Sequence, residues 1–199
     1  MSLKVILGDK NPELIAAWET EFANIPDVTV RGGNILLVKA DALVSPANSF
    51  GFMDGGLDWS ISELFEWKIQ AKVQKVIRER HAGELLVGAA EIIATGKDQF
   101  PFLICSPTMR VPQNVANSIN AFLCMRATLL AVTAFNKIEN LIQSVAVPGL
   151  CTGAGKMPYQ LSARQMRAAY DVVLGAKTNH YKTLADAIAE ERRYKDDLL

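Results

Sequence analysis

The chain has 199 residues, enough to bury a full hydrophobic core within one domain. Half of the residues are hydrophobic and 21% are charged, a composition that excludes an intrinsically disordered chain. The 21 basic and 21 acidic residues cancel, so the formal net charge of zero gives no long-range attraction for nucleic acids or anionic membranes.

The first 27 residues predict a strand followed by a helix. Residues 4–8 are mostly apolar and include β-branched side chains, which is typical of a strand. In the stretch 8–22, "GDKNPELIAAWETEF", Asn11 is a favourable helix cap and Pro12 fits the first helical position. The N-terminal apolar run is too short for a signal peptide, and no segment is suited to span a bilayer. We therefore expect a soluble, cytoplasmic protein.

Strands and helices then continue to alternate. The predicted strands span 28–38, 42–48, 85–96, 101–108 and 144–150, and the predicted helices span 57–83, 117–137, 160–175 and much of 181–199. This order predicts an α/β fold, a three-layer α/β/α sandwich with a mixed, mostly parallel central sheet. We interpret 1–199 as one domain with a core at about 28–175, an added β-α element at 1–27 and a polar helical extension at 176–199.

The cysteines and histidines are too few and too scattered for a metal centre. Cys105, Cys124 and Cys151 form no CxxC pair, and only His81 and His180 accompany them. This spacing excludes a zinc site or a disulfide framework and suits a reducing cytoplasm. We expect no metal and no cofactor.

Two loops are unusually rich in glycine. They are "SPANSFGFMDGGLD" at 45–58 and "PGLCTGAGKMP" at 148–158, and each lies between an apolar strand and a helix. In a parallel sheet such loops gather at the edge where ligands bind. The amides of Gly149, Gly153 and Gly155 can form an anion nest beside a helix N-terminus. The two loops together predict a clamp around a diphosphate.

Each feature also has a simpler interpretation. A single glycine-rich turn is more often only a turn, and neither loop has the spacing of a P-loop or a dinucleotide-binding fingerprint. Cys151 has no histidine near it in sequence, which favours a small packed residue over a nucleophile. The histidines fit surface or packing positions. Asp58 can serve simply as the cap of a helix that starts at Trp59.

Three separated motifs resemble the macro domain signature. They are Gly33-Asn34-Ile35, the stretch "DALVSPAN" at 41–48 and "GGLD" at 55–58. The segment "VPGLCTGAGKMP" at 147–158 is similar to the second glycine-rich loop of that family. The resemblance covers about residues 28–175. The residues of the motifs are most similar to those of a bacterial or phage-associated branch of this family.

The resemblance implies recognition of ADP-ribose, free or attached to a macromolecule. It implies that Asn48 bonds the distal ribose, that the amides near Gly56 and Gly153 hold the diphosphate, and that Asp58 orients a water. The implied catalytic pair is Asn48 and Asp58. The implied ligand-binding residues are Asn34, Ile35, Ala47, Asn48, Gly55, Gly56, Leu57, Thr152, Gly153, Ala154, Gly155 and Lys156.

The chain also departs from the family pattern. Asn34 replaces the aspartate that accepts from the adenine amino group, and a neutral acceptor makes the weaker hydrogen bond. Asp41 is no obvious substitute. Gly155 stands where an aromatic residue usually covers the ribose, so Phe50 or Phe52 would have to wall the cleft. Asp54, which has no counterpart, is a second candidate acid.

Three functions remain open at this level. The first is an enzyme that hydrolyses the ADP-ribosyl linkage or an ADP-ribose ester, with Asp58 contributing roughly 10²–10⁴-fold. The second is a non-catalytic module that binds ADP-ribose or a related nucleotide. The third is a phage-associated structural or interaction protein that has lost the ligand. The sequence indicates no membrane partner and no general nucleic-acid binding, and it leaves the oligomeric state open.

Overall fold

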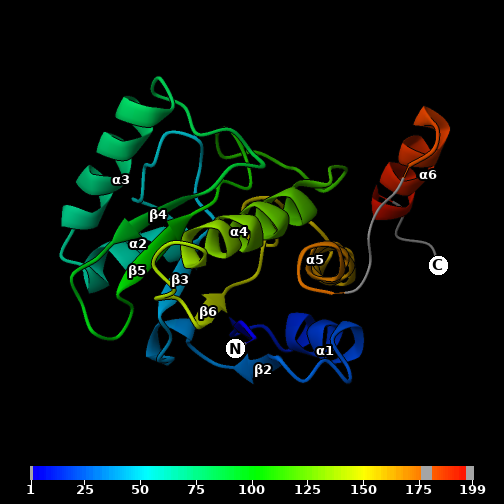
Figure 1. Cartoon of the computed structure of the whole chain (residues 1–199), viewed down its shortest axis with the longest axis horizontal. Coiled ribbons are helices and arrows are strands. Elements are labelled where there is room, and N and C mark those ends of the chain that lie inside the picture. The colour runs from blue at the N-terminus through cyan, green and yellow to red at the C-terminus, as the bar shows by residue number, and fades with distance from the viewer. Residues whose placement is uncertain (1, 176–180, 196–199) are drawn as a thin grey trace.

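A six-stranded sheet forms the centre of the molecule. The computed structural model describes residues 2–175 and 181–195, and Figure 1 shows the arrangement. The strands follow the spatial order β2-β1-β6-β3-β5-β4, all parallel except β4, which is antiparallel to β5. Their bounds are β1 (Lys4–Asp9), β2 (Val28–Gly32), β3 (Ala42–Ser45), β4 (Glu91–Ala94), β5 (Phe102–Cys105) and β6 (Ser144–Val147). The predicted mixed, mostly parallel sheet is confirmed.

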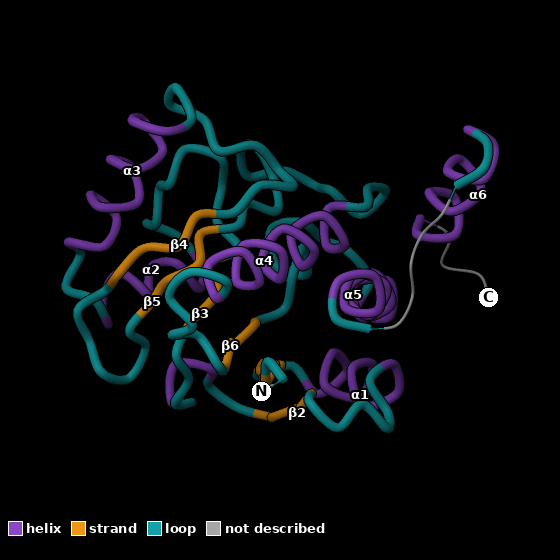
Figure 2. Tube along the Cα trace, in the orientation of Figure 1, coloured by secondary structure: helices purple, strands orange, loops and turns teal. Residues whose placement is uncertain are grey.

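Helices cover both faces of this sheet (Figure 2). One face carries α1 (Pro12–Glu21), α4 (Asn120–Asn136) and α5 (Tyr159–Val173), whose buried side chains form one apolar cluster. The other face carries α2 (Gly56–Leu64), α3 (Lys68–Arg80) and the short 3₁₀ helix η1 (Ile35–Leu37), which share a second cluster. The predicted three-layer sandwich is therefore present.

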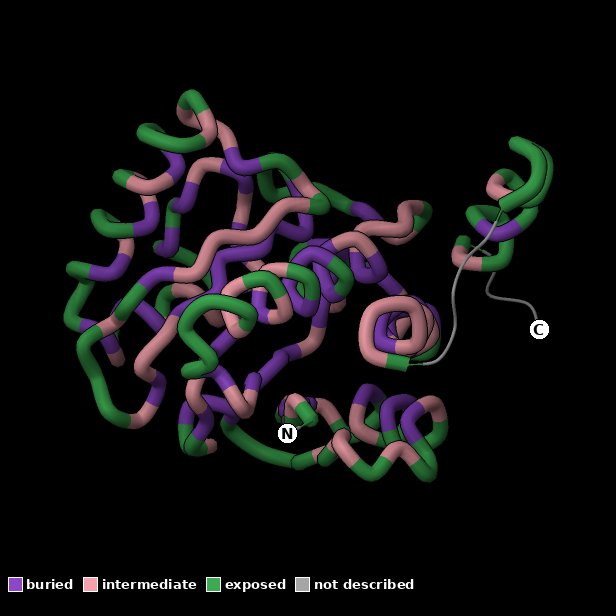
Figure 3. The backbone as a smooth tube through the Cα atoms, viewed as in Figure 1, coloured by how far each residue is buried: buried purple, intermediate pink, exposed green. Residues whose placement is uncertain are grey.

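The strands are buried on both sides, as expected for parallel strands covered by helices. Side chains alternate across a strand, so Val44 of β3 packs with α4 and α5 while its neighbour Leu43 packs with α2 and α3. Both side chains are fully buried. Figure 3 shows this buried centre, with exposed residues concentrated on the outer helices and loops.

Strand β1 lies inside the sheet. From the sequence, residues 1–27 are interpreted as a β-α element added to a core at about 28–175. Strand β1 pairs with β2 on one side and with β6 on the other. Its residues Val5 and Leu7 are fully buried. Helix α1 follows as predicted: the Asn11 side chain accepts hydrogen bonds from the backbone N–H groups of Glu13 and Leu14, at 2.9 and 3.3 Å. Strand β1 is thus part of the central sheet.

The single helix predicted at 57–83 is wrong, because the chain forms α2 and α3 there instead. Glu66 and Trp67 adopt left-handed backbone conformations with φ of 61° and 58°. The Trp67 ring packs edge-on against Trp59, with ring centroids 4.7 Å apart, which favours the sharp turn. The apolar spacing is helical on both sides of the break, so the periodicity does not reveal it.

All five strands predicted from residue 28 onward are shorter in the structure, and two of them are interrupted at a glycine. The strand predicted at 85–96 is reduced to β4, because the residues before it form a turn in which Gly88 has φ of 95°. The strand predicted at 28–38 ends at Gly32, since Gly33 adopts φ of 116° and η1 begins at Ile35. Both interruptions occur at glycines, which adopt positive φ at little cost.

The predicted C-terminal helix is present as α6 (Leu184–Lys195), while 176–180 and 196–199 lie outside the described residues. The ring of Tyr194 stacks on Phe122 of α4, and Gln165 of α5 donates to the Tyr194 carbonyl at 2.7 Å. Within the described ranges, none of the helices has the length and apolar character needed to cross a membrane.

Candidate functional site

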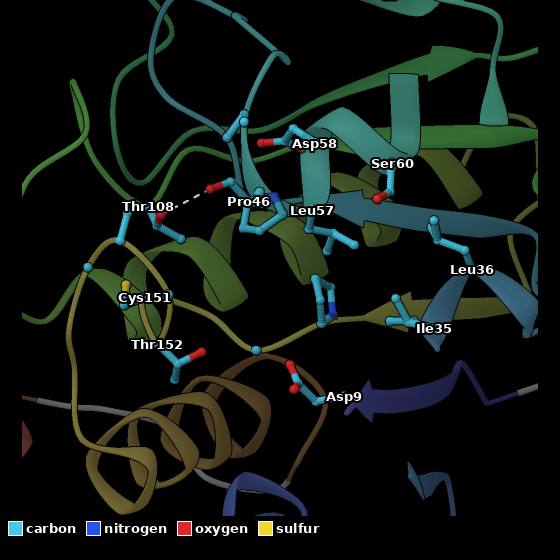
Figure 4. Close-up of a pocket in the computed structure, with 18 of the residues that line it drawn as sticks. Asp9, Ile35, Leu36, Pro46, Leu57, Asp58, Ser60, Thr108, Cys151 and Thr152 are labelled. Atoms are coloured by element: carbon cyan, nitrogen blue, oxygen red, sulfur yellow. Dashed lines mark hydrogen bonds between the residues drawn. The ribbon is translucent and has the colours of Figure 1, made fainter. Parts of the chain in front are cut away.

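A cleft of about 940 Å³ opens at the carboxyl ends of the parallel strands. Both glycine-rich loops line it, together with the end of β1, the segment around η1 and the loop after β5 (Figure 4). The two loops are roughly a hundred residues apart in the chain, yet they border the same cavity, as the diphosphate clamp requires. Predicted site residues that line the cleft are Asn34, Ile35, Ala47, Asn48, Gly55, Gly56, Leu57, Asp58, Thr152, Gly153, Ala154 and Gly155.

Asn48 folds the first loop with its own side chain. Its Oδ1 accepts from the backbone N–H groups of Phe50 and Phe52, at 3.1 and 3.3 Å, and its Nδ2 donates to the Phe52 carbonyl at 2.8 Å. An amide nitrogen carries two hydrogens, so one remains for a ligand. Asn48 thus shapes the loop that borders the cleft and keeps one donor.

The apolar residues of this loop anchor it and wall the cleft. Met53 is fully buried, and its N–H donates to the Gln70 side chain at 2.7 Å. Phe52 lines the cleft with 54% of its surface exposed. Phe50 does not line it and instead lies under the Arg110 guanidinium, 5.0 Å from ring centroid to Cζ. Of the two aromatic residues considered, Phe52 is therefore the wall.

The N-terminus of α2 points its amides at the cleft. Gly55 occupies the cap position without a side-chain hydrogen bond, so the first-turn N–H groups have no side-chain cap. A Cβ added to Gly55 or Gly56 would meet no atom within 4 Å, which shows that this turn faces open space. The partial positive charge of the helix end therefore faces a cavity large enough for an anion.

Asp58 lies on the third residue of α2, so its interpretation as the cap of a helix starting at Trp59 is wrong. The hydroxyl of Ser45, buried at the end of β3, donates to the Asp58 carboxylate at 2.6 Å. Burial raises the pKa of Asp58 to about 6, against the opposing effect of that hydrogen bond. Asp54 also lines the cleft and is exposed. The cleft thus contains one carboxyl group with a raised pKa, Asp58, and one exposed carboxyl group, Asp54.

The second loop uses its glycines in two different ways. A Cβ at Gly153 would meet nothing within 4 Å, so this residue is open to the cleft. A Cβ at Gly155 would collide with the Cys151 carbonyl oxygen and lie 2.8 Å from Val115 Cγ2, so an aromatic residue cannot fit there. Lys156 is exposed and is not among the lining residues, whereas 152–155 are.

Cys151 is packed rather than reactive. It adopts φ of 64°, is buried, and its burial raises the pKa of the thiol. A neutral thiol is a poor nucleophile. In the described ranges, no three His, Cys, Asp or Glu side chains are grouped as a metal site. His81 bonds Glu91 at 2.8 Å, and His180 lies outside those ranges.

The sequence reasoning missed the contribution of β1. Gly8, Asp9 and Lys10 line the cleft because β1 lies inside the sheet. The available signal was an acidic residue directly after an apolar strand, which is informative only when the position of that strand is known. Asp41 lies at the opposite end of β3, where it accepts from the N–H groups of Gln143 and Ser144 at 2.8 Å. It takes no part in the cleft.

The loop after β5 was missed as well. It contributes Thr108, Met109 and Pro112 to the cleft wall. The Thr108 hydroxyl donates a hydrogen bond to the Pro46 carbonyl at 3.0 Å. Met109 forms an isolated parallel β-bridge with Asn48. The loop after β5 therefore packs against the first glycine-rich loop.

Comparisons with known proteins agree with this geometry. A family model described as Macro domain matches residues 44–166, more than half of the chain. An uncharacterized protein of Aquifex aeolicus (strain VF5) is 36% identical over 143 residues, covering 70% of this chain and 78% of that protein.

Solved structures show the same fold. The macrodomain of Mycobacterium tuberculosis DarG superposes with a TM-score of 0.61 at 22% identity, covering 72% of this chain and 89% of that one. A mutant Oceanobacillus iheyensis macrodomain with ADPR gives 0.60 at 16% identity, covering 81% and 89%. The chain belongs to the macro domain family.

Proposed function

We propose that the cleft binds ADP-ribose, either free or attached to a macromolecule. The observation that carries this proposal is that an uncapped helix N-terminus at Gly55-Gly56 and the loop 152–155, which is open at Gly153, border one cavity. Backbone N–H groups and a helix dipole together favour a phosphate-bearing ligand. The mutant Oceanobacillus iheyensis macrodomain with ADPR supports the choice of nucleotide.

Local geometry, and not overall charge, would hold the anion. The chain has no net charge, and the lining residues of both loops offer mainly backbone donors. The volume of about 940 Å³ lies within the usual range for ligand clefts. Phe52 and Leu57 supply apolar walls, which exclude water and strengthen hydrogen bonds to the diphosphate.

A calorimetric titration tests the binding. We expect ADP-ribose and ADP to bind and AMP to bind more weakly, because AMP lacks the second phosphate. Gly153→Glu should abolish binding while leaving the fold intact, since that position is open. Ala71→Glu on the exposed face of α3 adds the same group away from the cleft and should bind normally. Absence of binding by the wild type would refute the proposal.

Asp58 favours a catalytic role in addition to binding. Its pKa of about 6 leaves the carboxylate mostly ionised at neutral pH yet able to take a proton. A carboxylate in that range can orient or deprotonate a water for hydrolysis of an ADP-ribosyl bond or ester, contributing roughly 10²–10⁴-fold. Ser45 fixes the orientation of the carboxylate through its 2.6 Å hydrogen bond.

Release of ADP-ribose from O-acetyl-ADP-ribose and from ADP-ribosylated protein or nucleic acid tests catalysis. Asp58→Ala should remove the release, and Asp98→Ala, an exposed aspartate outside the cleft, should not. Asp54→Ala measures whether the second carboxylate contributes. If the wild type binds ADP-ribose but releases none, the protein is a non-catalytic binding module.

A further inference from the structure

We propose that Arg110 is a positioning residue for the cleft. Its guanidinium, oriented by Glu84, holds the Phe50 ring in place and so keeps Asn48 in the conformation in which it borders the cleft. Neither Arg110 nor Glu84 lines the cleft itself. The inference rests on the proposed function and deepens it, because it names residues outside the cleft that set the affinity for the ligand.

Two backbone contacts hold the first glycine-rich loop at Ser49. The Ser49 N–H donates to the Arg110 carbonyl at 3.1 Å, which attaches the loop to the segment after β5. The Ser49 carbonyl accepts from the N–H of Leu85 at 2.8 Å, which attaches it to the connection between α3 and β4. Glu84 directly precedes Leu85, so these contacts bring Glu84 and Arg110 close to each other beside the loop.

The side chains of Arg110 and Glu84 form two hydrogen bonds with each other. Arg110 Nε donates to Glu84 Oε1 at 2.7 Å, and Nη2 donates to Oε2 at 3.1 Å. Such a bidentate pair fixes the plane of the guanidinium. The guanidinium also lies over Phe50, with Cζ 5.0 Å from the ring centroid, which is within the range of a cation–π contact. Glu84 therefore orients Arg110, and Arg110 covers Phe50.

The next residues of the loop are held by α3 instead. A Cβ added to Gly51 would be 2.7 Å from Val73 Cγ1 and 3.0 Å from Ile77 Cδ1, so the backbone lies directly against this helix. The Met53 N–H donates to the side chain of Gln70 in α3 at 2.7 Å. The segment 51–53 thus has its own anchor, which leaves Phe50 as the point at which Arg110 acts on the loop.

Phe50 is linked to the cleft through Asn48. The Asn48 Oδ1 atom accepts from the N–H groups of Phe50 and Phe52, at 3.1 and 3.3 Å. A shift of Phe50 breaks the first of these bonds and allows the Asn48 side chain, which lines the cleft, to rotate. A loop that must be ordered on binding lowers the affinity, so a contact that orders it beforehand strengthens binding.

The pair of Arg110 and Glu84 is better suited to positioning than to stabilising the whole fold. The side chain of Arg110 is 61% exposed and that of Glu84 is 28% exposed. Ion pairs with this degree of exposure contribute little to the free energy of unfolding. Loss of the pair should therefore loosen one loop and leave the rest of the fold unchanged.

Calorimetry and urea unfolding of the full chain test the inference. Arg110→Ala and Glu84→Ala should each weaken ADP-ribose binding by roughly three- to tenfold, with a nearly unchanged urea midpoint. Because Glu84 acts through Arg110, the double variant should bind no more weakly than Arg110→Ala. Arg126→Ala removes an exposed arginine of α4 outside the cleft and should bind normally. Losses that multiply in the double variant, or a lower urea midpoint with unchanged affinity, overturn the proposal.

Amide hydrogen exchange of the ligand-free protein, measured by NMR, tests the same role without a ligand. The Phe50 N–H should exchange faster in Arg110→Ala than in the wild type, whereas the Met53 N–H, which α3 holds, should not change. An unchanged rate at Phe50 overturns the role of Arg110. If the wild type binds no ADP-ribose, the proposed function fails, and the exchange rates still decide whether Arg110 holds the loop.

Discussion

Replacing Asp58 by Asn should stabilise the folded protein at neutral pH. The native pKa of Asp58 is about 6 against an ordinary value of 3.8, because burial disfavours the charged carboxylate. The protonated group contributes stability that is fully present below the unfolded pKa and is lost as pH rises through about 6. A difference of about two units corresponds to roughly 3 kcal/mol at most, since one unit is about 1.4 kcal/mol.

The asparagine variant removes this cost and keeps an oxygen that accepts from the Ser45 hydroxyl. Its advantage should therefore be smallest at pH 4, grow between pH 4 and 7, and level off at about 1–3 kcal/mol, the lower figure allowing for water in the cleft. Urea unfolding of both proteins across pH 4–8 measures it, with the exposed Asp98→Asn as a control that should show no such trend. A difference that is constant with pH, or that grows toward acid pH, would refute the reasoning.

Two further substitutions test the local geometry. Gly155→Ala should lower the free energy of unfolding by about 1–3 kcal/mol, because the new methyl would meet the Cys151 carbonyl and Val115; an unchanged urea midpoint would contradict this packing. Ser45→Ala removes the hydrogen bond that lowers the pKa of Asp58, so that pKa should rise further above 6. NMR titration of the Asp58 carboxyl measures it, and a midpoint that stays or falls would show that the Ser45 hydroxyl does not hold the carboxylate.

The parts of the structure that local patterns determine were predictable. The apolar strand β3 is followed by the glycine-rich loop "SPANSFGFMDGGLD" at 45–58. The apolar strand β6 is likewise followed by the glycine-rich loop at 148–158. Parallel strands bring such loops to one edge of the sheet, so a common cleft could be expected. The cleft residues from Ala47 to Asp58 and from Thr152 to Gly155 follow from this argument.

The parts that depend on long-range order were not predictable in the same way. The apolar run with β-branched residues identifies β1 as a strand but does not say that it inserts between β2 and β6. Asp9 is therefore absent from the predicted site residues, although it lines the cleft. The left-handed turn at Glu66 and Trp67 depends on the contact between two tryptophan rings, and no glycine marks it. Lys156 was expected to face the phosphates, yet its position depends on how the loop turns into α5.

A crystal structure determined after soaking with ADP-ribose tests the central claim most directly. We predict density for the diphosphate between the amides of 55–57 and those of 152–155, with the second ribose toward Asp58. Density elsewhere, or a cleft that stays empty at a saturating concentration, would contradict it.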